Sequence, residues 1–333
     1  MIKRDICIIG AGPVGLFAAF EAGLLKMRCH LIDALPQIGG QLSEIYPHKP
    51  IYDIPGYPEI KAMELVDKLM QQAAPFEPTF SLGERVESVE QLPDHSFLLV
   101  SNLGTIIHSR VVVIAGGLGS FEPRKPTISN LEKYEGKGVD YIIRDPEMLR
   151  DKRVVLAGGG DAALDWTIFL SSVAKVTLVH RGDTFRGLPD SADKVLELAM
   201  NKKINLILKS NILGIYGEDH LEGIALIGHD QLEQRIDADY LIPLFGLSPK
   251  LGPIADWALQ IDQQAISVNT FDYSTSREGI YAIGDINTYP GKLKLILSGF
   301  HEAALMAQSA FKHVHPEQKL NFKYTTVHGV NSF

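Results

Sequence analysis

The chain has 333 residues, of which 45% are hydrophobic and 22% are charged, and its formal net charge is −8. Because one domain usually takes about 100–200 residues, two domains are expected, each large enough to bury a core. This composition is typical of a globular protein, the negative charge argues against a nucleic-acid partner, and no apolar run reaches the roughly 18 residues that span a bilayer.

The first segment predicts a buried strand and not a secretory signal. Asp5 interrupts MIKRDICIIG, no small-residue cleavage site follows, and the apolar run enters a glycine-rich motif. A cytoplasmic location is therefore expected, with no membrane partner. The two cysteines, Cys7 and Cys29, lie in apolar, strand-like contexts. Two such cysteines exclude a disulfide framework and a cysteine-based metal site, and no metal centre is expected.

Residues 5–33 predict a strand, a tight turn, a helix over residues 14–25 and a second strand. The turn motif GAGPVG contains Gly10, Gly12, Pro13 and Gly15. Such glycines permit a sharp turn and a close approach of the backbone to a pyrophosphate, which the following helix N-terminus attracts. Asp33 ends the second strand, where a carboxylate can accept hydrogen bonds from a ribose. The alternative is a tight turn that binds no ligand.

A stretch rich in Gly, Pro and aromatic residues follows, then a helix over residues 62–73 and β-structure over residues 78–114. The strand, glycine turn, helix and strand then recur, about 148 residues after the first copy. The second turn motif, GGGDAA, contains Gly158, Gly159, Gly160, Asp161 and Ala163. Two glycine-rich turns of this type predict two dinucleotide sites in one chain.

The second copy ends differently from the first, because no acid follows its second strand. His180, Arg181 and Arg186 stand there instead. A ribose 2′-phosphate pairs well with arginine and is repelled by an acid, so this pattern favours NADPH over NADH. The alternative is that these are ordinary solvated cations.

The last part of the chain predicts β-structure over residues 205–243, a short strand in GIYAIGDI and an amphipathic helix over residues 294–313. Asp285 follows that strand, where it can bind a ribityl hydroxyl or serve as a turn or N-cap residue. The two Gly/Pro-rich crossings, AGGLGSFEPR and FGLSPKLGP, indicate that one domain is inserted in the other. The expected domains are residues 1–117 and 246–333 for the outer one and residues 118–245 for the inserted one.

The ordered motifs GAGPVG, GGQL, AGG, GGGDAA, HRxxxFR and GIYAIGD resemble those of low-molecular-weight thioredoxin reductases. In particular, the chain is similar over its whole length to the thioredoxin-reductase-like ferredoxin/flavodoxin–NADP⁺ reductases. Thioredoxin reductases carry a CxxC pair, which this chain lacks, so disulfide chemistry is out of reach. The resemblance implies an α/β fold with two Rossmann-like three-layer nucleotide-binding domains, the NADP(H) domain inserted in the FAD domain.

The resemblance also implies roles for individual residues. Asp33 would bind the adenosine ribose, Gln41 the flavin and Asp285 the ribityl chain, and the helix after Asp285 would direct its N-terminus at the flavin. Tyr46 and Tyr324 would stack on the two flavin faces. The other implied FAD contacts are Val86, Phe121 and a hydroxyl from Thr325 or Thr326. Gly182 replaces the second arginine of the family's HRRxxFR pattern, which leaves Arg181 and Arg186 for the 2′-phosphate.

The activity implied by the resemblance is that of a homodimeric, FAD-dependent ferredoxin (or flavodoxin)–NADP⁺ reductase. Hydride exchange between NADPH and flavin would be followed by one-electron transfer to an iron–sulfur or flavin carrier, with no general acid or nucleophile from the protein. One alternative is an NADPH-dependent flavin reductase acting on a quinone or another partner; another is a flavin-binding sensor without turnover. Four lysines can face an acidic carrier or be scattered solvated cations: Lys292, Lys294, Lys319 and Lys323.

Overall fold

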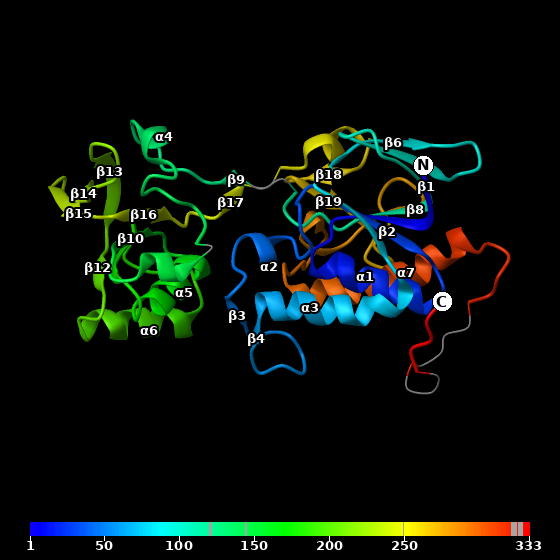
Figure 1. Ribbon diagram of the computed structural model, residues 1–333, viewed down its shortest axis with the longest axis horizontal. Helices are drawn as coiled ribbons and strands as arrows, with labels where there is room; N and C mark the ends of the chain where they lie inside the picture. The colour runs from blue at the N-terminus through cyan, green and yellow to red at the C-terminus, as the bar shows by residue number, and fades with distance from the viewer. Residues whose placement is uncertain (120–121, 144, 249, 321–324, 326–328) are drawn as a thin grey trace. The chain divides into compact units, whose positions relative to one another are not determined.

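The computed structural model describes residues 1–119, 122–143, 145–248, 250–320, 325 and 329–333. The chain forms two compact units (Figure 1), the first made of Met1–Ser120 with Pro249–Phe333 and the second of Phe121–Ser248. Each unit is built on a parallel sheet flanked by helices, which confirms the expected α/β class with two Rossmann-like domains.

The first unit combines a long sheet, three main helices and several short elements. Its α-helices and 3₁₀ turns are α1 (Pro13–Leu24), α2 (Gln41–Glu44), α3 (Ala62–Ala73), η1 (Ala74–Phe76), η3 (Gly252–Asp256), η4 (Gly284–Ile286) and α7 (Ile296–Val314). Its strands are β1 (Ile2–Ile9), β2 (Cys29–Asp33), β3 (Pro50–Ile51), β4 (Ile60–Lys61), β5 (Thr79–Leu82), β6 (Val86–Gln91), β7 (Phe97–Ser101), β8 (Ile106–Ile114), β18 (Ile261–Asp262), β19 (Ala265–Ser267), β20 (Ile280–Ala282) and β21 (Asn287–Thr288).

The main sheet of the first unit has the order β5-β2-β1-β8-β7-β6, with β20 also paired to β8. Strands β5, β2, β1, β8 and β20 are mutually parallel, whereas β7 and β6 form an antiparallel hairpin beside them. Val111–Ile114 at the end of β8 are completely buried, as expected for a parallel strand covered on both faces.

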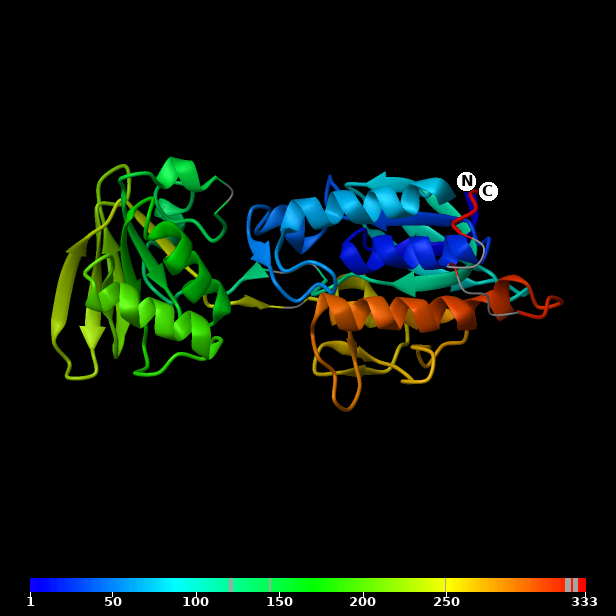
Figure 2. The same ribbon diagram turned by 90° about the horizontal axis from the view of Figure 1, so that it is seen from below.

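Helices α1, α3 and α7 cover one face of this sheet, with α1 lying between the other two (Figure 2). The core on that face joins apolar residues of the sheet to those of the three helices, including Ile8, Leu16, Val66 and Met306. The opposite face buries a second cluster beneath η3 and the small sheet β18-β19-β21, including Trp257 and Ile266. The first unit therefore has three layers, and its parallel strands all end at one edge.

The second unit repeats the plan at smaller scale. Its elements are β9 (Glu122–Pro123), α4 (Leu131–Tyr134), η2 (Pro146–Leu149), β10 (Arg153–Ala157), α5 (Asp161–Leu170), β11 (Lys175–Val179), α6 (Pro189–Met200), β12 (Asn205–Ile207), β13 (Ser210–Tyr216), β14 (Gly223–Gly228), β15 (Glu233–Asp237), β16 (Tyr240–Pro243) and β17 (Leu247–Ser248). Helix α5 packs on one face of a parallel sheet of order β12-β11-β10-β16. Buried residues of this sheet and of the antiparallel sheet β13-β14-β15 form a common core cluster.

The helix positions agree closely with the sequence periodicity. Helix α3 has the predicted bounds, and α1 begins one residue earlier than expected because Pro13 is well suited to the first helical position. Helix α7 begins at Ile296 instead of residue 294, since Leu295 is still extended.

Candidate functional site

Four segments of the first unit meet at the carboxyl edge of its parallel sheet. Asp33 ends β2, Gly10 follows β1, Gly116 follows β8, and Gly284 and Asp285 follow β20. Because β2, β1, β8 and β20 are neighbours in register, these segments lie side by side. In open parallel sheets, this edge is where ligands bind.

The first glycine turn leaves its backbone accessible while packing tightly beneath. A Cβ on Gly15 would lie 2.0 Å from the Gly10 carbonyl oxygen, so only glycine lets α1 approach β1 this closely. On the outer side, the nearest atom to a Cβ on Gly12 would be the Gly40 Cα, at 4.0 Å. Gly12 is the N-cap of α1 and has no side chain that could bond to the first N–H groups of the helix. This open backbone at a helix N-terminus fits the pyrophosphate of the expected FAD.

Asp33 lies directly beside this turn. Its two carboxylate oxygens accept hydrogen bonds from the backbone N–H of Ala11, at 2.7 Å, and of Leu35, at 2.9 Å. Burial raises the pKa of the Asp33 carboxyl, and the two backbone hydrogen bonds oppose that shift. A carboxylate has about four acceptor positions, so Asp33 is held in place and still has capacity for ribose hydroxyl groups.

Gln41 at the start of α2 and Tyr46 just after this helix lie near the same edge as Asp285. The Gln41 amide nitrogen would lie 3.3 Å from a Cβ on Gly117, which places this side chain against the segment after β8. Burial, and then the negative charge of Asp285, raise the pKa of Tyr46 to about 12. Tyr46 is therefore within electrostatic reach of Asp285, and it is part of the core packing and not a solvated turn residue.

Asp285 is half-buried, and its carboxylate makes no hydrogen bond to any other residue that the structure describes. Burial raises the pKa of this carboxyl, while the Lys292 and Lys294 cations lower it and Glu302 raises it further. A partly desolvated carboxylate with unused acceptor positions fits a polyhydroxyl chain such as the ribityl group of FAD.

Sequence reasoning missed Glu302, which lies directly beneath Gly284. Its side chain is fully buried and is paired with Lys292, whose side chain is 6% exposed. The two expectations for Lys292, a cation that faces an acidic carrier or a scattered solvated cation, are therefore wrong. Glu302 occupies a position on the apolar face of α7, where acids are rarely found. An acid at such a position was the signal available in the sequence.

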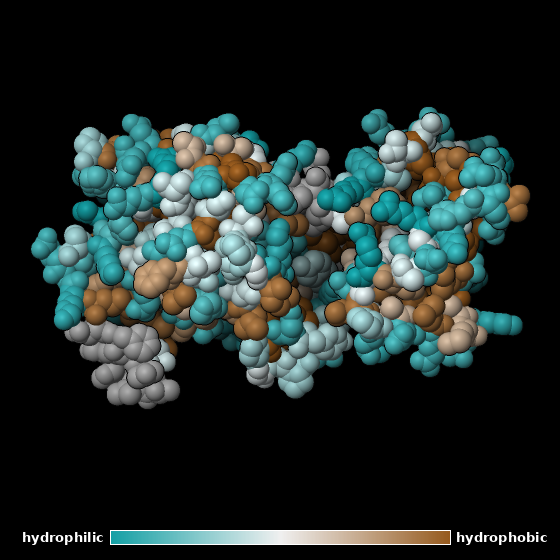
Figure 3. Space-filling view, turned by 180° about the vertical axis from the view of Figure 1, so that it is seen from behind, coloured by the Kyte–Doolittle hydropathy of each residue, from teal (hydrophilic) through white to brown (hydrophobic). Residues whose placement is uncertain are grey.

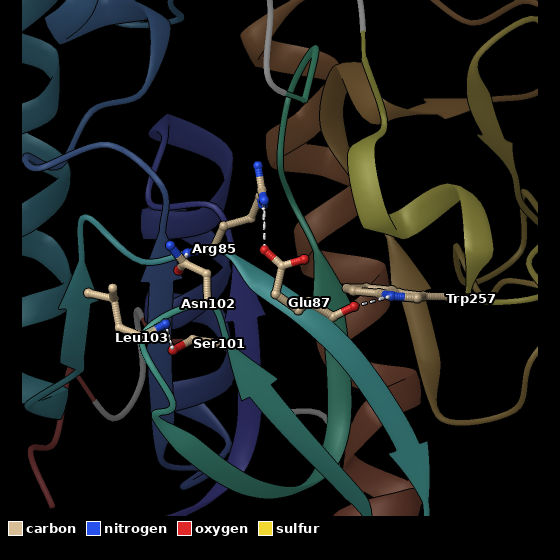
Figure 4. A network of polar contacts seen from close by, with 6 residues as sticks. All are labelled: Arg85, Glu87, Ser101, Asn102, Leu103 and Trp257. Carbon is tan, nitrogen blue, oxygen red and sulfur yellow. Dashed lines mark hydrogen bonds and ion pairs between the residues drawn. The ribbon is translucent and has the colours of Figure 1, made fainter.

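Val86 lies in β6 with its side chain buried. Figure 4 shows the contacts of the residues on either side of it, Arg85 and Glu87. The backbone N–H of Arg85 donates to the Asn102 side chain, and the Arg85 guanidinium pairs with Glu87. The Trp257 indole N–H donates to the Glu87 carbonyl at 3.4 Å. The segment before β6 also bonds to the Asp33 segment, since Glu84 N–H donates to the Asp33 carbonyl. The segment leading to Val86 is thus joined to the predicted adenosine side of the site.

Three predicted FAD contacts, Phe121, Tyr324 and Thr326, lie outside the described residues. Thr325 is described and exposed, and its carbonyl accepts a hydrogen bond from the Gly329 N–H.

The second glycine turn has its own close contact, made by His180. A Cβ on Gly159 would lie 2.2 Å from the His180 ring, and His180 Nε2 hydrogen-bonds the Thr184 carbonyl at 3.0 Å. His180 is thus buried beneath the turn, where it supports the backbone. Above the turn, a Cβ on Gly160 would meet no atom within 4 Å. Gly160 caps α5 without a side-chain hydrogen bond, which again fits a pyrophosphate.

The segment after β11 folds back over the N-terminus of α5. Arg186 N–H donates to the Gly159 carbonyl at 2.7 Å, and Leu188 N–H donates to the Asp161 carboxylate at 2.7 Å. The side chains of Arg181 and Arg186 are exposed, and neither forms an ion pair with another described residue. Gly158 packs against Ala163 under the turn. Two exposed arginines without ion pairs, in the segment that folds over a glycine turn, fit a nucleotide with an additional phosphate.

Three further observations concern the cysteines, metal ligands and helices that the structure describes. Cys7 and Cys29 are both buried, and burial raises the pKa of the Cys7 thiol to about 12. No three His, Cys, Asp or Glu side chains among the described residues are grouped to hold a metal ion. Within the same residues, no helix has the length and apolar character needed to cross a membrane. Figure 3 shows hydrophilic residues spread over the visible face of both units, with hydrophobic residues in separate groups.

Comparison with known proteins places this arrangement among flavoprotein reductases. The family model for pyridine nucleotide-disulphide oxidoreductases matches residues 4–310. The chain is 61% identical to ferredoxin–NADP reductase 1 of Christiangramia forsetii, over 100% of this chain and 96% of the relative. It is also 61% identical to the ferredoxin–NADP reductase of Flavobacterium johnsoniae, over 100% of this chain and 95% of the relative.

Solved structures with the same fold include two thioredoxin reductases. That of Lactococcus lactis has a TM-score of 0.79 at 25% identity, covering 94% of this chain and 100% of its own. The thioredoxin reductase of T. acidophilum has a TM-score of 0.82 at 23% identity, and the match covers 94% of this chain and 99% of that chain. These similarities extend over both units of the chain.

Proposed function

The chain belongs to the pyridine nucleotide-disulphide oxidoreductase family, and from this premise we propose that it is an FAD-dependent ferredoxin–NADP⁺ reductase. The observation that carries the proposal is the pair of open glycine turns, one in each unit, with Asp33 beside the first and Arg181 and Arg186 beside the second. The full-length relatives at 61% identity are named ferredoxin–NADP reductases, which supports the same activity. The absence of a CxxC pair from the sequence separates the chain from disulfide reduction.

FAD is proposed to occupy the edge of the first unit. Its pyrophosphate would bind at the turn of Gly10, Gly12 and Gly15, and Asp33 would accept from the adenosine ribose. When bound, FAD supplies hydride and one-electron chemistry that no side chain provides. Asp285 would accept from the ribityl chain, while Gln41 and Tyr46 would orient the flavin ring.

NADP(H) is proposed to occupy the second unit. The turn of Gly158, Gly159 and Gly160 would bind its pyrophosphate at the N-terminus of α5. Arg181 and Arg186 would pair with the 2′-phosphate, and His180 would hold the turn from below. Asp161 would act by fixing the folded-back segment through Leu188, which keeps Arg186 close to the nucleotide.

The proposed carrier is ferredoxin, with flavodoxin as a second acceptor of the same electrons. We also propose a homodimer in which Tyr324 and the hydroxyl of Thr325 or Thr326 reach the partner subunit's flavin, and a cytoplasmic location. Sedimentation of the purified protein tests the dimer, since a monomer at micromolar concentration would contradict it.

Steady-state kinetics test the activity. Rates are measured with NADPH and NADH, each with ferredoxin, flavodoxin and the quinone menadione as acceptor. The proposal expects NADPH to be preferred and ferredoxin to be reduced with a higher kcat/KM than menadione. A rate with menadione alone would instead indicate a quinone reductase, and no turnover with any acceptor would indicate a flavin-binding sensor.

A further inference from the structure

The most unusual buried group in the first unit is the Glu302 carboxylate on α7. Its side chain is completely inaccessible, and it accepts four hydrogen bonds. Oε2 accepts from the Gly284 backbone N–H at 2.6 Å and from the Asn287 amide at 2.8 Å. Oε1 accepts from the Tyr289 hydroxyl at 2.9 Å and from the Lys292 ammonium. A buried carboxylate is tolerated only when it is satisfied in this way.

All four donors belong to residues 284–292, the segment that carries Asp285 and leads to α7. Glu302 thus joins three parts of this segment to one point on the helix: Gly284 in the turn, Asn287 at its end, and Tyr289 with Lys292 in the following loop. The Asn287 amide also donates to the Ala282 carbonyl at 3.0 Å, which links the network to the end of β20. Gly284 itself has φ of +78° and packs against Val14 of α1. The turn is therefore held from beneath by a charged group and from the side by the first glycine motif.

The two charges of the pair also act on Asp285. Lys292 lowers the pKa of the Asp285 carboxyl and Glu302 raises it, so the two influences partly cancel. If either partner were neutral, the other would remain as an unpaired buried charge near Asp285, with only the Lys294 cation still acting on that carboxyl besides it. In a site of low polarity, such an isolated charge has a large effect on neighbouring ionised groups.

We propose that Glu302 and Lys292 are positioning residues for FAD, which hold the Gly284–Ile286 turn in its binding geometry and keep the electrostatic potential at the ribityl and flavin side of the site balanced. This inference rests on the proposed function, because it requires FAD at the edge where Asp285 lies. Neither residue needs to touch the cofactor. The pair acts through the backbone of the turn and through the field at Asp285.

Three variants test the proposal: Glu302→Gln, Lys292→Met and the double variant that carries both changes. Each single variant is expected to bind FAD at least tenfold more weakly when the apoprotein is titrated and flavin fluorescence is followed. The midpoint potential of the bound flavin distinguishes an effect of the unpaired charge from a distortion of the Gly284–Ile286 turn. Glu302→Gln leaves an uncompensated cation and raises the potential, whereas Lys292→Met leaves an uncompensated anion and lowers it. The double variant returns towards the wild-type potential.

The matched control is Asp239→Asn, which breaks an ion pair of the second unit. Asp239 accepts from the Arg153 backbone at 2.8 Å and from its guanidinium at 2.6 Å, so this variant also loses a charge pair with backbone support. It is expected to lower the unfolding temperature while FAD affinity and potential stay at wild-type values. Unchanged FAD affinity in both single variants, or potentials that move in the same direction, would overturn the proposal.

If either single variant does not fold, Tyr289→Phe provides a milder test. It removes one hydrogen bond to Glu302 and leaves both charges in place. FAD affinity is expected to fall severalfold while the potential changes little, and an affinity equal to that of the wild type would count against the proposal. Two different results would refute the two proposals. If the wild-type apoprotein takes up no FAD, the proposed function is wrong. If the wild type and every variant take up FAD equally well, only the role proposed for Glu302 and Lys292 is wrong.

Discussion

Single residues at strand ends were the part of the site most accessible to sequence reasoning. Asp33 and Asp285 each follow a short apolar strand, and the parallel sheet brings both to one edge. Glu302 gave a weaker signal, because an acid on the apolar face of a helix is unusual but does not reveal its partner. That partner, Lys292, is ten positions away in an irregular loop. No periodicity connects a loop lysine to a helix glutamate, so only the folded backbone shows that they meet. For the same reason, the sequence alone does not indicate that Lys292 is buried.

His30 in β2 predicts a pH dependence of stability. It is buried between the Thr79 and Ser81 hydroxyls, at 2.8 and 3.1 Å. Burial, and then the nearby Arg4 cation, lower its pKa to about 4, whereas an unfolded chain has a histidine pKa of about 6.5. Between these values the unfolded state binds more protons, so the free energy of unfolding falls as pH falls from about 6.5 towards 4.

Urea unfolding of the wild type and of His30→Gln at pH 7 and pH 5 measures this contribution. Glutamine keeps hydrogen-bonding groups near Thr79 and Ser81 but does not titrate. The stability loss between the two pH values should be smaller in the variant, because the other acid-sensitive groups are common to both proteins. Equal losses in the two proteins would show that His30 is not responsible.

At the scale of elements, the glycine turns were predictable and the support beneath them was not. Each GxGxxG-like motif follows an apolar strand and precedes a helix, so strand, turn and helix could be placed from sequence. His180 was expected to face the nucleotide because it adjoins Arg181. The structure shows its ring packed against Gly159, a contact that residue type and spacing do not reveal.

Gly159→Ala tests the role of that packing. The new methyl group would lie 2.2 Å from the His180 ring, so the turn or the ring must move. NADPH affinity is expected to fall at least tenfold while FAD content is unchanged. Gly214→Ala is the control, since a Cβ at that position of the same unit meets nothing within 4 Å. Isothermal titration with NADPH compares the two, and wild-type affinity in Gly159→Ala would contradict the prediction.

The two arginines after β11 predict the nucleotide preference. Hydrogen bonds to a charged group contribute about 1.5–3 kcal/mol, so replacing Arg181 or Arg186 by Ala should weaken NADPH binding by roughly tenfold or more. NADH binding should change little because NADH lacks the 2′-phosphate. Lys203→Ala removes an exposed cation of the same unit and serves as the control. If both arginine variants lose affinity for NADH and NADPH equally, these side chains do not read the 2′-phosphate.

At the scale of the whole molecule, the internal duplication revealed the architecture. Two strand–glycine–helix–strand segments, with apolar β-structure resuming after the second, predicted one nucleotide domain within another. The small sheet that covers the first unit could not be predicted in the same way. Strands β18, β19 and β21 have only two or three residues each, too few to show alternation. Their positions depend on long-range packing against Trp257 and the main sheet.

The last residues of the chain are also held by contacts that could not be predicted from the sequence. The Lys26 ammonium donates to the carbonyls of Asn331 and Ser332, at 2.8 and 2.7 Å, and the Phe333 ring packs edge-on against Phe76. Lys26 and Phe76 lie next to the C-terminal end of α1, whereas the glycine turn lies at its N-terminal end. The last residues therefore pack on the first unit near the C-terminal end of α1, away from the carboxyl edge of its parallel sheet.

In the proposed reductase, a flavin bound in the first unit is the only redox centre between NADPH and the carrier. Anaerobic titration of the purified, FAD-loaded protein with NADPH tests it most directly, with flavin absorbance followed and oxidised ferredoxin added afterwards. About one equivalent of NADPH is expected to bleach the flavin band, and ferredoxin is expected to restore it, because one hydride reduces one flavin and no CxxC pair stores electrons. A flavin band that NADPH leaves unchanged, or a protein that takes up no FAD, would show that the flavin does not carry these electrons.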